Sequence, residues 1–278
     1  MHSQRTSVSE AAGASIAEAF AFDLDGTIYL GDQLLPGAGE LMLYLRSKRL
    51  PHVFATNNSS RPVGHYVEKL GAMGIMVSHE QVVTSNEVAA AYLLQRGLAS
   101  VYIVGTPEVV AEYGRAGVAH EAGDPQAVLL TYDTTLTYEK LAQANAFLLS
   151  GLPYFATHPD LVCPGPAGPL PDCGAFAALL EASSGRLPVN LGKPSRSMAE
   201  AIRSRLRCRD DERVAFVGDR LYTDVRMANE HGFQAILTLT GEASGADPSM
   251  SEAVPDLVVL GMEDLLSRLL ARTEAPLP

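Results

Sequence analysis

The sequence predicts an α/β protein built from parallel sheets, because apolar runs of strand length alternate with segments of helical periodicity along the chain. Its 278 residues are enough for two units that each bury a core of their own. Polar turns rich in aspartate, asparagine and threonine follow several of the apolar runs directly, and open α/β sheets bind their ligands where strands end. We therefore expect two α/β units and a ligand site at the ends of strands.

The expected elements fall into three blocks. The first block is a βαβα unit with strands at 20–24 and 52–56 and helices at 38–48 and 63–73. The middle block has strands at 101–106, 128–132 and 154–157, with helix-period segments after the first two, and looks self-contained. The last block resumes short buried strands at 189–191, 214–217 and 235–239, with helices near 197–206 and 223–231.

A segment crowded with proline and glycine, 157–174, interrupts this alternation. Its prolines are Pro159, Pro164, Pro166, Pro169 and Pro171. Proline excludes a helix interior or a central strand, so we expect a stiff, shaped loop there.

Composition excludes several classes of function. The 32 acidic and 21 basic residues leave a net charge of −11, which disfavours nucleic acid and anionic membranes as partners. The first 19 residues lack a cationic stretch followed by an apolar one, so we expect a cytoplasmic protein. Three cysteines without Cys-x-x-Cys spacing indicate free thiols, not a zinc site.

The strongest motif is FAFDLDGTIYL, in which an apolar strand ends in two aspartates. Asp23 and Asp25 lie two residues apart on one face of a strand, and Gly26 allows a sharp turn. One carboxylate can attack an electrophile while the other exchanges protons. A calcium-binding loop is the alternative. Such a loop needs another metal ligand at position 27 and a glycine after position 28, whereas this sequence has Thr27 and Ile28 and follows a buried strand.

Two further motifs supply groups suited to a phosphate. HVFATNNSS ends another strand in Thr56, Asn57 and Asn58, whose hydroxyl, amide and backbone N–H groups can donate to phosphate oxygens. Such residues also cap helices and form turns. NLGKPSR places the cation of Lys193 just before a helix, although a lone lysine is more often a surface residue.

The fourth motif, VAFVGDRLYTDV, adds two more carboxylates. Asp219 ends a strand and Asp224 starts the next helix. Beside the first aspartate pair, these residues would form the oxygen-rich site that a hard divalent ion prefers. The four motifs together, each after a predicted parallel strand, are far more specific than any one of them.

In this order the motifs resemble those of the haloacid dehalogenase superfamily. DLDGTIY, TNNSS, GKP and VGDRLYTD, with roughly a hundred residues between the second and third, resemble its subfamily IIA, the NagD-like and 4-nitrophenylphosphatase branch. The resemblance implies a Rossmann-like core with a parallel sheet from residues 1–81 and 188–278. It also implies an inserted α/β cap of the C2 type at 82–187.

The resemblance also implies a magnesium-dependent phosphatase that works through an aspartyl-phosphate. Asp23 would be the nucleophile and Asp25 the acid and base. Thr56, Asn57, Asn58 and Lys193 would hold the phosphate, with Thr56 and Lys193 stabilising the charge that develops during transfer. Mg²⁺ would be held by Asp23, the Asp25 backbone carbonyl and Asp219, with Asp224 orienting the hydrated ion.

Two alternatives remain open at this point. A phosphomutase uses the same acid, although its usual cap is helical and enters just after the first motif. A protein that binds a phosphate ligand without turnover is the second alternative. Phosphate release with and without magnesium separates these three functions.

The substrate is expected to be a small phosphomonoester, such as a sugar phosphate or a nucleotide. Segment 157–174 resembles the loop that related caps present to the active site, so Asp160 or Cys163 is expected to contact the leaving group. In pyridoxal phosphate phosphatases a substrate-contacting histidine aligns with Cys163, which argues against that substrate. His158 is expected to be a structural hydrogen-bonder. Caps of this branch can pair, so a homodimer through the cap is also compatible with the sequence.

Overall fold

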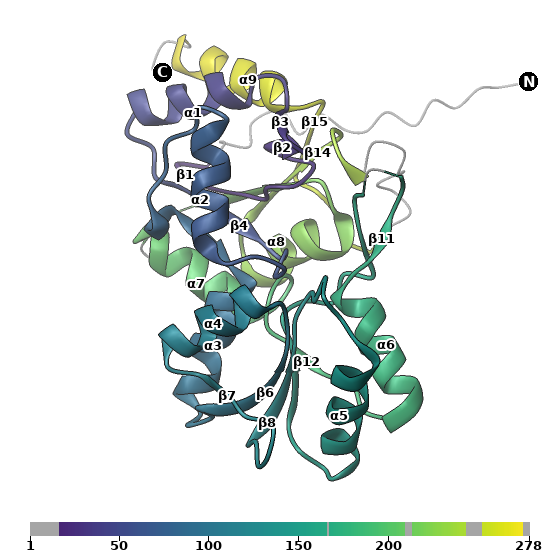
Figure 1. Cartoon of the computed structure of the whole chain (residues 1–278). Helices are drawn as coiled ribbons and strands as arrows, with labels where there is room; N and C mark the ends of the chain where they lie inside the picture. The colour runs from purple at the N-terminus through teal and green to yellow at the C-terminus, as the bar shows by residue number, and fades with distance from the viewer. Residues whose placement is uncertain (1–16, 166, 209–212, 243–251, 275–278) are drawn as a thin grey trace, which may run out of the picture.

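The computed structural model describes residues 17–165, 167–208, 213–242 and 252–274. Most of the N-terminal stretch discussed above, residues 1–16, lies outside the described residues. Two parallel sheets, one above the other in Figure 1, form the framework of the protein. The predicted α/β class with parallel sheets is confirmed.

The first sheet has six strands in the order β15-β14-β13-β1-β4-β5, and all are parallel. They are β1 (Ala19–Phe22), β4 (His52–Thr56), β5 (Val82–Thr84), β13 (Val214–Gly218), β14 (Gln234–Thr238) and β15 (Leu257–Val259). Every residue of β1 is buried, because it lies between β4 and β13 and is covered on both faces. A strand in this position must be apolar throughout, as AFAF is.

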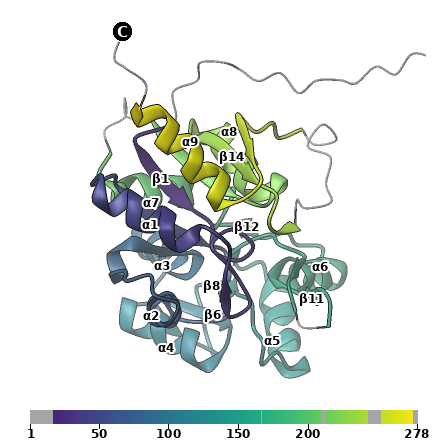
Figure 2. The same ribbon diagram turned by 90° about the horizontal axis from the view of Figure 1, so that it is seen from above.

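Helices cover both faces of this sheet, and we call the unit the core. One face packs against α1 (Ala38–Ser47), α2 (Val63–Ala72) and α9 (Met262–Glu274), as the view from above shows for α1 and α9 (Figure 2). The opposite face packs against α7 (Arg196–Leu206) and α8 (Arg226–His231). A π-helical turn, Leu221–Val225, leads into α8.

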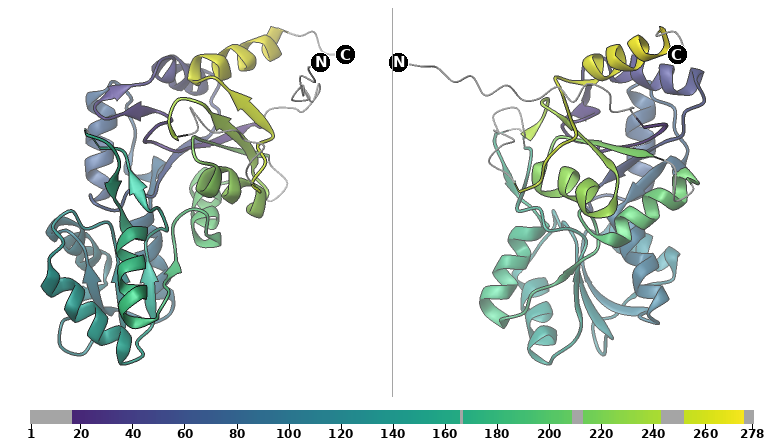
Figure 3. Two further views of the ribbon diagram at one scale, coloured as in Figure 1. Left: turned by 90° about the vertical axis from the view of Figure 1, so that its right-hand side faces the viewer. Right: turned by 180° about the vertical axis from the view of Figure 1, so that it is seen from behind.

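The second sheet has five parallel strands in the order β12-β9-β8-β6-β7. They are β6 (Ser100–Val104), β7 (Ala119–His120), β8 (Ala127–Leu130), β9 (Tyr154–Ala156) and β12 (Val189–Asn190). Its helices are α3 (Ser85–Gln95) and α4 (Pro107–Ala116) on one face, and α5 (Tyr138–Leu149) and α6 (Cys173–Ser184) on the other. This sheet and its helices form a separate layered unit beside the core (Figure 3), which we call the cap.

The remaining elements are short. They are the hairpin of β2 (Tyr29–Leu30) and β3 (Gln33–Leu34), the hairpin of β10 (Val162–Cys163) and β11 (Leu170–Pro171), and a 3-10 turn at His79–Gln81. The second hairpin lies within the proline-rich segment, where a two-stranded ribbon tolerates proline because no central strand is needed. The segment closes tightly on the helix after it, since a Cβ on Gly174 would lie 2.2 Å from the Pro159 carbonyl oxygen.

Strand pairing locates where the chain passes between the two sheets. β5 pairs with β4 and so belongs to the core sheet. β12 pairs with β9 and so belongs to the cap sheet, although the strand expected at 189–191 was assigned to the core. The domain division at 82 and 187 stays a prediction, and this pairing favours boundaries a few residues further along the chain. Among the described helices, none is long and apolar enough to cross a membrane.

Candidate active site

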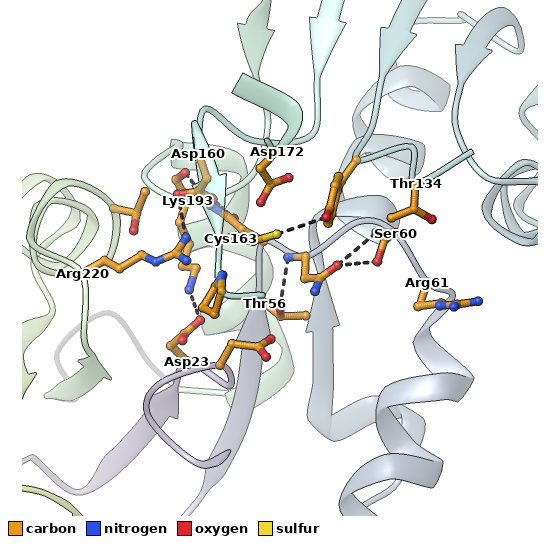
Figure 4. Close-up of a pocket in the computed structure, with 16 residues that line it drawn as sticks. Asp23, Thr56, Ser60, Arg61, Thr134, Asp160, Cys163, Asp172, Lys193 and Arg220 are labelled. Carbon is orange, nitrogen blue, oxygen red and sulfur yellow. Dashed lines mark hydrogen bonds and ion pairs between the residues drawn. The ribbon is translucent and has the colours of Figure 1, made fainter. Parts of the chain in front are cut away.

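A pocket of about 230 Å³ opens between the core and the cap (Figure 4). Its core wall follows the carboxyl ends of β1, β4 and β13, and its cap wall follows those of β8 and β9. The lining residues are Asp23, Asp25, Thr56, Asn57, Asn58, Ser60, Arg61, Tyr132, Thr134, Asp160, Cys163, Pro164, Asp172, Lys193, Arg220 and Thr223. The pocket therefore collects residues from all four motifs together with residues of the cap.

Asp23 and Asp25 leave the end of β1 as expected. The Asp23 backbone N–H donates to the Val217 carbonyl at 2.8 Å, which continues the pairing of β1 with β13. Gly26 has a φ of 87°, and a Cβ there would lie 2.5 Å from Asp219 Oδ2, so only glycine fits this turn. Burial raises the pKa of Asp25, even though Lys69 lies close enough to lower it.

A carboxylate cluster lies at the ends of β1 and β13. Asp23, Asp219 and Asp224 are buried and each offers an oxygen within 4.8 Å of the others. Asp219 Oδ2 accepts the Glu242 backbone N–H at 2.7 Å, whereas its Oδ1 has no hydrogen-bond partner. Burial and the neighbouring Asp224 raise the pKa of Asp219 to about 7.

This cluster suits a hard divalent cation, because its donors are all oxygens and one buried oxygen lacks a partner. The Asp25 side chain does not belong to it. Its metal role would depend on the backbone carbonyl, as the family resemblance implies, and this stays a prediction.

Lys193 brings a buried cation to the cluster. Its side chain is 2% exposed, and Nζ pairs with Asp23 Oδ1 and with Asp224 Oδ1, the latter at 2.8 Å. Burial alone would lower the lysine pKa, but the carboxylates of Asp224 and Asp23 raise it above its ordinary value. The lysine therefore stays charged. It follows β12, so a strand of the cap sheet delivers a cation to the core.

The residues after β4 have different roles in the structure. Thr56 Oγ1 accepts the Asn58 backbone N–H at 3.0 Å. The Asn57 side chain accepts the Lys193 backbone N–H at 2.8 Å and donates to the Lys193 carbonyl at 3.1 Å. Asn58 Oδ1 accepts from the backbone N–H and the hydroxyl of Ser60. Both asparagine side chains thus shape loops, and phosphate contacts through this segment stay a prediction.

The cap wall carries mostly uncharged donors. Cys163 Sγ donates to the Tyr132 hydroxyl at 3.1 Å, and Thr134 and Asp172 lie beside them (Figure 4). Sequence reasoning found Cys163 but missed Tyr132, Thr134 and Asp172, which follow no motif. It also missed Arg220, which could have been found because it directly follows Asp219 in the fourth motif.

His158 and Asp160 are buried between the two units. His158 Nδ1 lies 2.9 Å from Asp160 Oδ2, and Nε2 lies 3.5 Å from Asp172 Oδ1. Burial alone would lower the His158 pKa, but the charge of Asp172 and the hydrogen bond and charge of Asp160 raise it. The histidine is held away from the solvent by structural contacts, in agreement with its expected role.

Comparison with known proteins identifies the family. A haloacid dehalogenase-like hydrolase model matches residues 20–119, and a second model, HAD-hydrolase-like, matches residues 190–265. An acid sugar phosphatase of Staphylococcus aureus is 31% identical over 91% of this chain and 98% of its own. A 4-nitrophenylphosphatase of Thermotoga maritima superposes with a TM-score of 0.86 at 42% identity, covering 90% of this chain and 97% of its own.

A third relative has been solved with magnesium. It is a glycerol phosphate phosphatase of Mycobacterium tuberculosis, with a TM-score of 0.80 at 30% identity over 90% of this chain and 76% of its own. These similarities confirm the prediction from the motifs. The chain belongs to the haloacid dehalogenase-like hydrolases, in the NagD and 4-nitrophenylphosphatase group, and is a phosphatase of small phosphomonoesters.

Proposed function

We propose that the chain is a magnesium-dependent phosphatase that forms an aspartyl-phosphate on Asp23. The observation that carries this proposal is the pairing of buried Asp23 with buried Lys193 beside two further carboxylates. A nucleophile, a permanent cation and a cluster of oxygen ligands at one end of a pocket are what transfer of a phosphoryl group requires.

Two steps account for the hydrolysis. An Asp23 carboxylate oxygen attacks phosphorus, the bond from phosphorus to the leaving oxygen breaks, and Asp25 gives its proton to that oxygen. Asp25 then takes a proton from the water that attacks phosphorus, and the phosphoryl group leaves Asp23 as inorganic phosphate. The raised pKa of Asp25 supports this role, because a carboxyl that holds its proton can act as an acid.

Asp23, Asp219 and the Asp25 carbonyl would hold Mg²⁺, and Asp224, which lies in the same carboxylate cluster, would orient the hydrated ion. When bound, the ion supplies positive charge that offsets the repulsion between Asp23 and an anionic phosphate. Lys193, on the loop after β12, supplies a second positive charge beside Asp23. The Asn57 side chain bonds the backbone of Lys193 and so holds the loop after Thr56 beside the lysine, which supports a role for this loop in binding the phosphate.

The substrate is proposed to be a small phosphomonoester with hydroxyl groups, such as a sugar phosphate or glycerol phosphate. The names of the Staphylococcus and Mycobacterium relatives support this class. The cap wall also supports it, because Tyr132, Thr134 and Cys163 offer hydrogen-bonding groups without charge. Nucleotides remain alternatives, and the pocket volume of about 230 Å³ favours smaller leaving groups.

Phosphate release from a broad panel of metabolite phosphates, measured with and without Mg²⁺, tests this proposal. We expect turnover of several polyol phosphates that stops without the metal. Transfer of the phosphate to a second position of the substrate would favour a phosphomutase instead. Binding without turnover would favour the non-catalytic alternative.

A further inference from the structure

One carboxylate of the cap contacts two of the core's catalytic loops at once. Asp160 is 1% exposed, and its Oδ2 accepts from Asn57 Nδ2 at 2.8 Å. Its Oδ1 pairs with Arg220 Nη1 at 3.1 Å. Asn57 belongs to the loop after β4, and Arg220 belongs to the loop after β13 that also carries Asp219.

Asn57 extends this link to the third loop. Its side-chain amide bonds both the backbone N–H and the carbonyl of Lys193. A Cβ on the neighbouring Gly192 would lie 2.6 Å from Asn57 Oδ1, so the two loops are in close contact. The chain of contacts from Asp160 through Asn57 therefore ends at the loop whose lysine pairs with the nucleophile Asp23.

The cap holds Asp160 in place from behind. His158 Nδ1 lies against the same Oδ2 atom, and His158 is itself fixed by Asp172 at the start of α6. Burial would raise the Asp160 pKa, but His158, Arg220 and Asn57 hold it well below its ordinary value. These contacts use both carboxylate oxygens, so the geometry favours a role within this network over contact with a leaving group.

We propose that Asp160 is a positioning residue that aligns the loops of Asn57, Lys193 and Arg220 when the cap covers the core. It then serves transfer of the phosphoryl group from every substrate and does not select among leaving groups. This differs from the contact with the leaving group that the sequence suggested for Asp160. The inference rests on the proposed phosphoryl transfer at Asp23.

Asp160→Asn tests the inference, because an amide cannot accept from Asn57, Arg220 and His158 together. We expect kcat to fall by about 10-fold to 100-fold with KM little changed, equally for nitrophenyl phosphate and for polyol phosphates. The inhibition constant of orthovanadate, whose trigonal-bipyramidal adducts imitate the transferring group, should rise in the same proportion. That of inorganic phosphate should stay the same.

Glu112→Ala, which removes the acceptor of another contact between the cap and the core, is the control. Glu112 is a cap carboxylate that also reaches the core, where it accepts the Val63 backbone N–H at 2.7 Å, away from the three loops. Its variant should keep the wild-type inhibition constant for vanadate. If both variants behave alike, loosening of the cap in general explains the loss, and the role of Asp160 is refuted.

Other outcomes are equally decisive. A lower kcat with an unchanged vanadate constant means that only the folded fraction has fallen, which overturns the proposal. A loss that differs between leaving groups makes Asp160 a specificity residue. If Asp160→Asn does not fold, Arg220→Gln removes the same ion pair from the core side and must weaken vanadate. A wild-type enzyme that resists vanadate refutes the phosphoryl transfer itself, and with it this inference.

Discussion

The core wall and the cap wall of the pocket differ in how far their carboxylates are paired with cations and hydrogen-bond donors. On the core wall, one lysine pairs with Asp23 and Asp224, and an oxygen of the neighbouring Asp219 has no hydrogen-bond partner. On the cap wall, Asp160 is bonded to Arg220, His158 and Asn57. Excess negative charge on the core wall suits a metal cation, whose charge would then attract a phosphate, whereas the cap wall leaves neutral groups for the rest of the substrate.

This contrast teaches that reactivity and selectivity are built from different groups. In the proposed mechanism, groups that carry uncompensated charge would act on the phosphate, which all substrates share. Groups that carry hydroxyls and a thiol would contact the part in which substrates differ. Changes on the core wall should therefore affect all substrates equally, and changes among the neutral cap groups should not.

The largest effect is expected at Asp23. Asp23→Asn should abolish turnover of every substrate, because an amide cannot form the acyl phosphate. Asp25→Asn should retain the nucleophile and lose about 100-fold to 10,000-fold, the usual contribution of an acid and base. Phosphate release under single-turnover conditions measures both. Persistent turnover by the Asp23 variant would exclude the covalent route.

Removal of the metal is expected to have the next largest effect. Excess EDTA should stop phosphate release, and Mg²⁺ should restore it, because the buried carboxylates otherwise repel an anionic phosphate. Ca²⁺ should inhibit, since it prefers longer and more numerous bonds. Isothermal titration of the apoprotein gives a second readout, in which Asp219→Asn should weaken Mg²⁺ binding. Full activity in EDTA would show that the cluster has another purpose.

Much of the core half of the site could be predicted because Asp23, Thr56 and Asp219 stand at the ends of core strands. In a parallel sheet the carboxyl ends of neighbouring strands meet, so Asp23, Thr56 and Asp219 had to converge. Strand β4 was predicted with the bounds that the structure shows. The position of Lys193 beside Asp23 followed from the family motifs and not from the geometry of the sheet.

The cap half could not be predicted, because its residues come from loops without a motif. Tyr132 and Asp172 lie far apart in sequence and meet only through packing of the cap. The strand expected at 189–191 was placed in the core sheet, whereas β12 pairs with β9 of the cap sheet. So short a run of strand residues does not indicate which strand it will pair with. Asn57 was expected to contact a phosphate, but its side-chain amide bonds the backbone of Lys193 instead. The sequence alone does not distinguish these two roles, because an amide can bond a ligand or a backbone equally well.

A smaller effect, and one that differs between substrates, is expected on the cap wall. Cys163→Ala removes a thiol that donates to the Tyr132 hydroxyl at 3.1 Å and lines the pocket. We expect relative kcat/KM among good substrates to change by about 3-fold to 30-fold, with little change for nitrophenyl phosphate. Cys208→Ala, in a thiol that does not line the pocket, is the control. If kcat/KM falls by the same factor for every substrate, the proposed difference in role between the core wall and the cap wall is wrong.

The smallest effect concerns the stability of the cap wall itself. His158 is buried among Asp160, Asp172 and Arg220, and its pKa in the folded protein is raised. Its contribution to the free energy of unfolding is therefore fully present below about pH 6.5, the unfolded value. This contribution is lost as the pH rises through the folded value. The Asp160 pKa is lowered, so its contribution is present above about pH 3.9 and is lost as the pH falls through the folded value.

The raised pKa values of Asp23, Asp172 and Asp219 also make the wild type less stable as the pH rises. The pH dependence of the wild-type stability alone therefore does not reveal the contribution of His158. The difference between wild type and His158→Gln does identify it. We expect thermal unfolding to separate the two proteins by a few degrees at pH 6 and to bring them together at high pH. A separation that is the same at every pH would mean that folding leaves the His158 pKa unshifted, and that the cap wall does not neutralise its charges in this way.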